Sequence, residues 1–473
     1  MTFFVNILRK HSKDLNKNFI IETNSIFYLK NWLSCDRINK RVLKLGVIMK
    51  RILILTVTAG NGHNACAKAM KEKLESEYGQ VEVKIIDLLK TYSSAIKIWV
   101  ADKGYSIAIG KFRHLYNMFY EYYLSRKPSQ RYRCAAQGVA MSLVEGLYRE
   151  INEFKPDVIY STHFYGGIAI SNLRLVYDIP CKVIVANLDY VNSPFWEASI
   201  GIDYFIIPND DFIKPSLKIG YKESQLKSFG LPVNEKFYKE VDKSTARQEL
   251  GLDKDIFTIM IMYGGGRWGG GFNIFKDVLS CFKDRKVQII MINGHNEKDY
   301  ERISKMKFKP NIKVLNVGFT NQVDLYMSAS DIIINKLGGT SATEMINKRL
   351  PAIVTPVVSG QEKHNLKYLM KKGAVKTFKD KKELKKVIFD LMDNPKHYQE
   401  MVENISKLRV NGIDRLAKFI MDQPTAMYDQ EKIDKIDYKQ VTKNVIKAKR
   451  KAHRSEQISY RKELKNEKYC NCG

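Results

Sequence analysis

The sequence predicts an α/β protein made of two doubly wound domains, each with a parallel sheet between layers of helices. Two observations carry this prediction. Short apolar runs alternate with helical stretches from about residue 50 to about residue 420, and many runs end in glycine-containing turns. The alternation pauses after residue 233 and restarts at residue 257, which divides the chain into two domains.

The composition fits a folded protein with more than one domain. The chain has 473 residues, and 44% of them are hydrophobic. Seven scattered cysteines without a CxxC pair favour a reducing compartment. No run reaches the roughly 18–20 apolar residues of a spanning helix, and the N-terminus lacks a signal peptide's apolar core. We therefore expect a location in the cytosol or, peripherally, on the cytoplasmic face of the cell membrane.

The net charge of +28 predicts attraction to a polyanion. Nucleic acid and an anionic membrane leaflet both meet this description, and the charge alone does not separate them.

These patterns divide the chain into four segments. Residues 1–48 form a basic N-terminal extension, either weakly structured or an added helix. Residues 49–233 and 234–422 are the two domains, and residues 423–473 form a basic helical tail. Ten lysines and arginines against three glutamates over residues 441–473 favour a solvated helix with possible membrane contact.

The first domain opens with a strand over residues 51–58, a glycine-containing turn that includes Gly62 and His63, and a helix over residues 64–76. A second strand follows at residues 81–87. Doubly wound folds place ligands at the carboxyl ends of such strands, so His63 is a candidate catalytic residue. A histidine at a helix start can also serve only as a structural hydrogen-bonding group.

Aromatic and basic side chains interleave over residues 96–133. This mixture is typical of a membrane interface, but it also suits single-stranded nucleic acid or ordinary helix packing. With Gly62, the candidate acceptor and membrane contacts are Trp99, Phe112, Arg113, Tyr116, Phe119 and Arg126.

The remaining strands are predicted from buried-type apolar runs. Asp189 follows one of them directly. In the first domain they span residues 156–161, 182–187, 203–208 and 225–229; in the second domain they span residues 257–263, 287–292, 312–317, 332–334 and 351–355.

The second domain carries the phosphate-binding pattern. Six glycines over residues 264–271 follow its first strand, and Gly338 and Gly339 turn the chain into a helix at Thr340. A similar turn precedes Gln361. Because a helix N-terminus presents unpaired N–H groups and a positive dipole end, two such turns on neighbouring strands predict one nucleotide diphosphate between them.

Several stretches resemble one enzyme family: TAGNGHNACAKA, ANLDYVNSPFW, and the tandem VGFTNQVDLYMSASDIIINKLGGTSATEM and GQEKHN. The chain resembles the GT-B glycosyltransferases, and more narrowly the monogalactosyldiacylglycerol synthase and processive diacylglycerol glucosyltransferase family, which is related to the enzyme that adds N-acetylglucosamine to lipid I. The resemblance covers roughly residues 50–420 and implies two Rossmann-like domains that face a cleft. The family signatures K-P-G-G-L-T-x-S-E-A and P-G-Q-E-x-x-N are altered here at Leu337, Thr340, Ser341, Thr343, Met345 and Ser359.

The resemblance also implies roles for individual residues. His63 or Asp189 would be the catalytic base. The donor-binding residues would be Gly264 and Gly265 for phosphate, Phe319 for uracil, Gly339, Thr340 and Ser341 for diphosphate, Glu344 for ribose, and Gln361, Glu362 and Asn365 for sugar and phosphates.

The implied reaction is inverting transfer of glucose or galactose from a UDP-sugar to diacylglycerol at an anionic membrane surface. No metal or further cofactor is expected, and no nucleic-acid partner. Two alternatives stay open: another lipid-linked acceptor, or a UDP-sugar-binding membrane-surface protein without activity.

Overall fold

The structure is a computed structural model, and it describes residues 49–58, 62–92, 115, 118, 121–122, 135–263, 270–356 and 360–452. The expected N-terminal extension, residues 1–48, lies outside the described residues.

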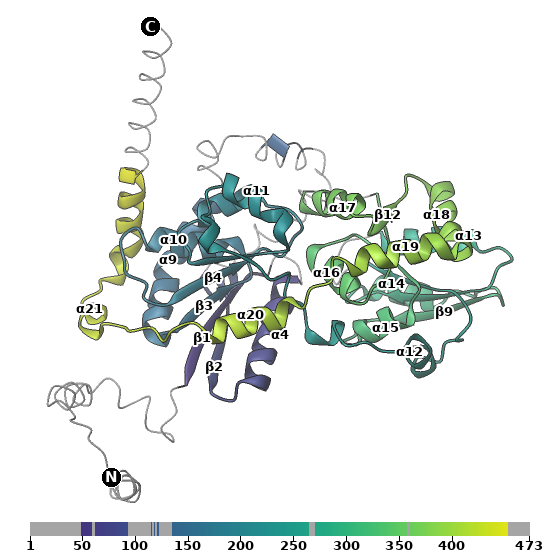
Figure 1. The fold of residues 1–473 in the computed structure, drawn as a ribbon, viewed down its shortest axis with the longest axis horizontal. Coiled ribbons are helices and arrows are strands. Elements are labelled where there is room, and N and C mark those ends of the chain that lie inside the picture. Colours follow the sequence, from purple (N-terminus) through teal and green to yellow (C-terminus); the bar gives the residue numbers. More distant parts are fainter. Residues whose placement is uncertain are drawn as a thin grey trace, which may run out of the picture. The chain divides into compact units, whose positions relative to one another are not determined.

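The first domain is built on a six-stranded parallel sheet with the strand order β2-β1-β3-β4-β5-β6 (Figure 1). Its central strands are apolar and fully buried, as expected for strands that are covered on both faces. The strands are β1 (Lys50–Thr56), β2 (Val81–Asp87), β3 (Val158–Ser161), β4 (Lys182–Ala186), β5 (Tyr204–Ile207) and β6 (Leu226–Ser228).

The helices of the first domain connect these strands. The α4 helix packs against β1 and β2, whereas α9 packs against α5 and α10. The helices are α4 (Gly62–Glu77), α5 (Leu88–Tyr92), α9 (Ala135–Phe154), α10 (Phe164–Leu173) and α11 (Ile213–Lys218), with 3-10 turns at η1 (Pro194–Ser199), η2 (Asp210–Phe212) and η3 (Glu223–Gln225).

The second domain repeats this architecture with the strand order β12-β11-β10-β7-β8-β9, again all parallel. Its strands are β7 (Thr258–Met262), β8 (Val287–Ile292), β9 (Ile312–Val317), β10 (Ile332–Asn335), β11 (Ala352–Val354) and β12 (Val375–Thr377). Its helices are α12 (Lys243–Glu249), α13 (Gly271–Cys281), α14 (Glu297–Ser304), α15 (Val323–Ala329), α16 (Gly339–Asn347), α17 (Gln361–Lys371), α18 (Lys381–Asp393) and α19 (Pro395–Ser406), and η4 (Glu235–Phe237) precedes α12.

The prediction of two doubly wound domains is confirmed. Every strand expected from an apolar run is present, with ends shifted by at most two residues. The β12 strand was not predicted. It has three residues at the edge of the sheet and pairs only with β11, so it is too short to leave a periodic pattern.

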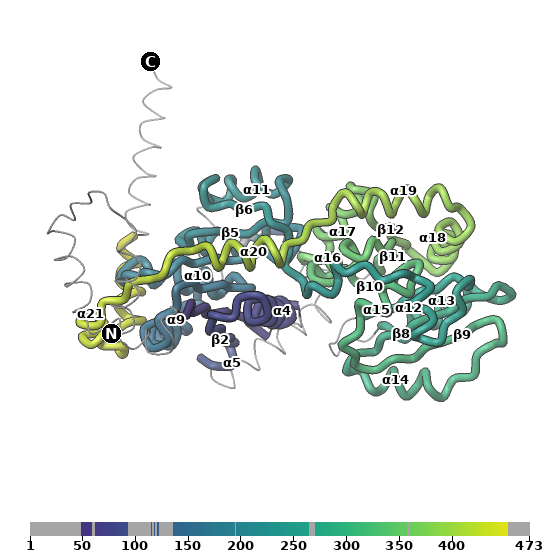
Figure 2. Tube along the Cα trace, turned by 60° about the horizontal axis from the view of Figure 1, so that its bottom comes forward, coloured from purple at the N-terminus to yellow at the C-terminus, as the bar shows by residue number. Residues whose placement is uncertain are grey.

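After α19 the chain returns to the first domain. Figure 2 shows it running from α19 through α20 (Gly412–Met421) to α21 (Gln430–Asp434). The α20 helix packs on α4, and the ring of Phe419 lies 4.8 Å from that of Tyr204 and 5.2 Å from that of Phe229. The last segment of α20 is tied to β1, because Lys50 Nζ donates to the carbonyl oxygen of Met421 at 2.5 Å.

The sequence predicts a solvated tail helix. The helix over residues 438–452 is instead partly buried. Val441 and Val445 are fully buried, and Asn444 Nδ2 donates to the Tyr177 hydroxyl at 3.1 Å. The valines, spaced four residues apart, form an apolar stripe that the count of charges concealed. Only the opposite face of this helix carries exposed lysines and arginines.

The two connections between the domains touch each other. Gly230 has a φ of +87°, which favours glycine, and a Cβ atom there would lie 3.0 Å from Val410 Cγ1. A Cβ atom at Gly412 would lie 2.8 Å from the carbonyl oxygen of Leu231. Both glycines therefore permit a close backbone approach where the chain passes between domains.

A buried ammonium group stabilises this crossing point. Lys73 on α4 forms ion pairs with Glu77, with Glu235 at 2.9 Å and with Asp414 at 2.7 Å, and its side chain is only 6% exposed. Burial would lower the pKa of Lys73, but the hydrogen bonds that it donates to the three carboxylates outweigh this effect and raise it. The Lys73 ammonium group thus links three segments: α4, the connection that leads from the first domain to the second, and α20.

We predict that Lys73→Met lowers the melting temperature by roughly 4–8 °C, because three carboxylates then face one another without a cation. Thermal unfolding followed by circular dichroism measures the change. Lys68→Met on the same helix is the matched control, since Lys68 is 73% exposed and lies 3.6 Å from Glu72. Equal changes in both variants would contradict the role given to Lys73.

Candidate functional site

The candidate residues lie at the carboxyl ends of the strands in both sheets. His63 follows β1 and Asp189 follows β4 in the first domain, whereas Phe319 follows β9 in the second. The helices α16 and α17 begin after β10 and β11. This is the edge at which open α/β sheets bind ligands.

Gly62, the first residue of α4, brings the first domain against α16. A Cβ atom at Gly62 would lie 2.5 Å from Thr340 Oγ1, so a larger residue would require the Thr340 side chain to move. The structure therefore places the turn that carries His63 beside the predicted phosphate-binding helix.

His63 is held in a neutral form with a defined orientation. Its Nδ1 atom lies 2.5 Å from the carbonyl oxygen of Thr162, which can only accept, so Nδ1 carries the proton and Nε2 is left as an acceptor. The ring keeps part of its surface exposed, but the surrounding atoms desolvate it and lower its pKa, although the bond to Thr162 opposes this effect. A neutral imidazole with a free Nε2 is able to accept a proton.

A second histidine lies next to His63. The ring of His163 is 4.7 Å from that of His63, and its Nδ1 accepts from the backbone N–H of Tyr165 at the start of α10. Burial, followed by the neighbouring His63, lowers its pKa well below the usual value. His163 is therefore a neutral helix cap that packs on the candidate base.

Asp189 contacts the second domain through both its side chain and its backbone neighbours. Its carboxylate accepts from Asn365 Nδ2 at 2.9 Å and lies beside Gly339. Burial raises the pKa of Asp189 to about 6, and the bonds from Asn365 and Gly339 limit the rise. A Cβ atom at Gly339 would lie 1.8 Å from the carbonyl oxygen of Leu188, so only glycine allows this contact.

The N-terminus of α16 has no side-chain cap of its own. Gly338 is the N-cap residue, and the hydroxyl of Ser341 donates to the carbonyl oxygen of Gly338 at 3.0 Å instead of accepting from a backbone N–H. The Thr340 hydroxyl, in turn, lies against Gly62 on α4. The predicted diphosphate-binding N–H groups of Gly339, Thr340 and Ser341 therefore have no partner within the helix.

Glu344 lies one turn further along α16. Burial raises its pKa to about 8, although nearby Lys236 opposes the rise and Asp324 adds to it. Burial also raises the pKa of the Cys66 thiol to about 12, and the neighbouring Glu344 adds to this rise. At neutral pH the Glu344 carboxyl holds its proton and can both donate and accept a hydrogen bond.

The α17 helix begins after Gly360, whose φ is +52°. Gln361 and Glu362 are half-buried in its first turn. Burial lowers the pKa of Lys336, and the nearby Glu362 acts in the opposite direction and raises it. Asn365 is fully buried, and its amide contacts protein groups on both sides: Oδ1 accepts from the N–H of Tyr190 at 2.7 Å, and Nδ2 donates to Asp189.

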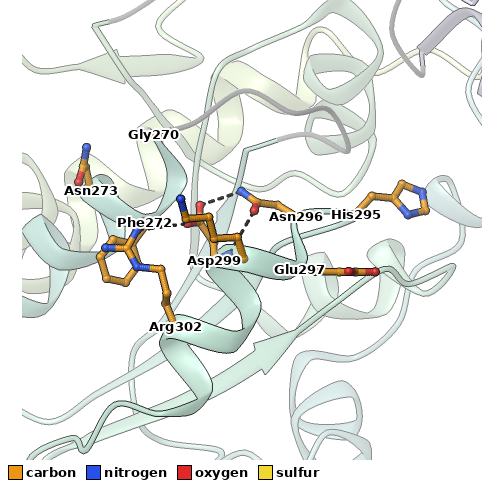
Figure 3. A pocket seen from close by; sticks show the side chains of 9 residues that line it. Gly270, Phe272, Asn273, His295, Asn296, Glu297, Asp299 and Arg302 are labelled. Carbon is orange, nitrogen blue, oxygen red and sulfur yellow. Dashed lines mark hydrogen bonds and ion pairs between the residues drawn. The ribbon is translucent and has the colours of Figure 1, made fainter.

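An exposed aromatic shelf lies at the far end of the second sheet. Phe319 is 61% exposed, and its ring stacks on that of His295 with centroids 4.4 Å apart and an angle of 16°. His295 also lines a hollow of about 580 Å³ between α13 and α14, and Figure 3 shows Arg302 and Phe272 at the other end of it. This arrangement suits a flat ring such as a base.

Some predicted residues lie outside the part of the chain that the structure describes. They are Gly264 and Gly265 from the glycine-rich turn, and the candidate acceptor and membrane contacts Trp99, Phe112, Arg113, Tyr116, Phe119 and Arg126.

Sequence reasoning missed two features of the site. His295 was not predicted, although it follows β8, which pairs with the strand before Phe319, so the rule of neighbouring strand ends would have found it. The contacts of Asn365 with Asp189 and Tyr190 carry no local signal, because the partners are 175 and more residues apart.

Comparisons with known proteins match both domains. Residues 63–233 match the family model for monogalactosyldiacylglycerol (MGDG) synthase, and residues 270–416 match the glycosyltransferase family 28 C-terminal domain. The chain is 28% identical over 389 residues to the probable chloroplastic monogalactosyldiacylglycerol synthase of Glycine max, covering 79% of this chain and 71% of the relative. It is 27% identical over 364 residues to the processive diacylglycerol beta-glucosyltransferase of Staphylococcus haemolyticus, covering 76% and 90%.

A solved structure has the same fold. MurG of Acinetobacter baumannii aligns with a TM-score of 0.52 at 16% identity, covering 79% of this chain and 99% of that one. At this identity the match speaks for the fold alone.

The raised pKa of Glu344 predicts a pH-dependent stability. Between pH 4.5, its ordinary pKa, and about 8, the folded protein keeps a proton that the unfolded chain releases, so stability falls as the pH rises through this window. We expect Glu344→Gln to match the wild type at pH 5 and to be more stable by about 1–3 kcal/mol at pH 8.5.

Thermal unfolding at the two pH values measures this difference. Glu301→Gln is the matched control, because the Glu301 side chain is 68% exposed. A Glu344→Gln effect of the same size at pH 5 and pH 8.5 would show that the carboxyl is ionised throughout.

Proposed function

Because the chain belongs to the monogalactosyldiacylglycerol synthase and processive diacylglycerol glucosyltransferase family of GT-B glycosyltransferases, we propose that it transfers a hexose from a UDP-sugar to diacylglycerol. The names of the relatives supply the acceptor and the two candidate hexoses, galactose and glucose. Transfer would invert the anomeric carbon and leave a glycolipid in the membrane.

One observation carries this proposal: the turn at Gly62 and His63 lies directly against the N-terminus of α16. A base from one domain and an anion-binding helix from the other thus meet at a single place. An enzyme that moves a sugar from a nucleotide to an alcohol requires both groups within reach of one anomeric carbon.

The second domain would hold the donor. The N–H groups of Gly339, Thr340 and Ser341 would bind its diphosphate, with Gly264 and Gly265 approaching from the glycine-rich turn. The protonated Glu344 would bind the ribose hydroxyls. Phe319 would present its backbone to the uracil, with the His295 ring stacked on its side chain. Gln361 and Glu362, at the start of α17, would contact the sugar.

In the transfer step, His63 Nε2 would accept the proton of the diacylglycerol hydroxyl. The oxygen attacks the anomeric carbon as the bond from that carbon to the UDP oxygen breaks, and UDP leaves with the bonding electron pair. The N–H groups and dipole of α16 would stabilise the charge on UDP, so the scheme needs no metal ion. Asp189 is the alternative base, but its carboxylate is engaged with the Asn365 amide.

We also propose contact with anionic lipids at the cytoplasmic face of the membrane. Within the described ranges, every helix is too short or too polar to cross a bilayer. The tail helix supports surface binding, because Lys439, Lys443, Lys447 and Arg450 form an exposed basic stripe opposite the buried valines. Each such side chain contributes about 1 kcal/mol near an anionic surface. Residues 96–133 would supply the acceptor contacts.

The direct test is transfer of label from UDP-glucose and UDP-galactose to vesicles that contain diacylglycerol and phosphatidylglycerol. We expect labelled glycolipid with at least one donor. His63→Ala should lower the turnover number roughly 100- to 10,000-fold, because the acceptor hydroxyl loses its base, while UDP affinity stays within about twofold.

His397→Ala, a change at a half-exposed histidine paired with Asp390 on the outer helices of the second domain, is the matched control and should keep full turnover. Asp189→Asn, assayed in parallel, tests the alternative base. No labelled product with either donor would reject the proposed reaction, and unchanged turnover in His63→Ala would reject the base.

A further inference from the structure

The predicted diphosphate position in this structure is filled by a group of the protein itself. The Asp189 carboxylate lies against Gly339, the first residue of α16. A Cβ atom at Gly339 would lie 2.7 Å from Asp189 Oδ1 and 1.8 Å from the carbonyl oxygen of Leu188. The Leu188 carbonyl and the Asp189 carboxylate therefore occupy space beside the first residue of α16 that a bound phosphate would need.

Asn365 holds the carboxylate in this position. Its Nδ2 donates to Asp189 Oδ1 at 2.9 Å, and its Oδ1 accepts from the N–H of Tyr190 at 2.7 Å. Asn365 is fully buried, and Nδ2 also lies 3.4 Å from the carbonyl oxygen of Leu337, the residue before the α16 N-cap. One amide therefore connects the Asp189 segment to both phosphate-binding helices.

Neighbouring contacts stabilise the same arrangement. The Tyr190 hydroxyl lies 3.1 Å from Thr343 Oγ1 on α16, and its ring stacks on that of Tyr368 with centroids 5.6 Å apart. The Tyr368 hydroxyl donates to Asp211, which pairs with Lys372 at 2.6 Å. These contacts, which we call the interdomain seam, lie beside the α16 N-terminus, and their nearest link to Gly339 is the bond that Thr343 Oγ1 donates to its carbonyl oxygen at 2.9 Å.

We propose that Asp189 is the resident anion of the α16 N-terminus, positioned by Asn365, and that the diphosphate of the donor binds by displacing it. This inference rests on the proposed function and adds a specific role to Asp189. The helix N-terminus then has a negative partner both in the empty protein and in the donor complex. Asp189 thereby acts on donor affinity, as a competitor for the N–H groups, rather than on the acceptor hydroxyl.

The test compares the affinity for UDP and for uridine in the full-length protein. Asp189→Ala should bind UDP about tenfold more tightly than the wild type, because the diphosphate no longer competes with a carboxylate. Uridine has no phosphate, so its affinity should change by less than about twofold. Titration calorimetry measures UDP, and ligand-observed NMR measures uridine. Asp189→Asn, which keeps the shape of the side chain, should also tighten UDP binding if the alanine variant folds poorly.

Asp211→Asn is the matched control, since it weakens the interdomain seam without touching Gly339. It should leave UDP affinity within about twofold of the wild type. Unchanged or weaker UDP binding in both Asp189 variants would overturn the inference and leave the proposed function intact. Equal tightening of UDP and uridine, or equal tightening by Asp211→Asn, would also overturn it, because a general opening of the seam would then be the cause. Failure of the wild type and of both Asp189 variants to bind UDP would overturn the inference and the proposed function together.

Discussion

The arrangement of the site depends on the unpaired N–H groups at the start of α16. This helix begins at two glycines and has no side-chain cap in the described part of the chain, so its positive end requires a partner from elsewhere. The absence of a Cβ atom at Gly339 lets residues 188 and 189 of the first domain, with the Asp189 carboxylate, approach this end of the helix. The same lack of bulk at Gly62 brings the His63 turn to Thr340.

The rest of the fold holds these two segments near each other. The two connections between the domains touch through Gly230 and Gly412, and α20 packs back on α4, the helix that begins at Gly62. Lys73 forms ion pairs with three carboxylates at this crossing, one of them from α20. The elements that position the candidate base therefore include a segment from the far end of the chain.

Local patterns were sufficient to predict every described strand except β12. The roles of the donor-binding residues came from the family resemblance and stay predictions. The family resemblance and the fold class are confirmed by the matched domains and the MurG alignment. The structure adds what depends on distant segments: the return of α20, the burial of Val441 and Val445 on the first domain, and the bond between Asn365 and Asp189. A motif places a residue at a strand end, but its partner in another domain depends on tertiary packing.

A crystal structure of the protein with UDP tests the central claim most directly. The claim is that the α16 N-terminus is an anion site used in turn by Asp189 and by the diphosphate. We expect a phosphate oxygen to accept from the Gly339 N–H, the Glu344 carboxyl to contact the ribose, and Asp189 to have left Gly339. UDP bound with its phosphates elsewhere, while Asp189 still lies against Gly339, would contradict the account.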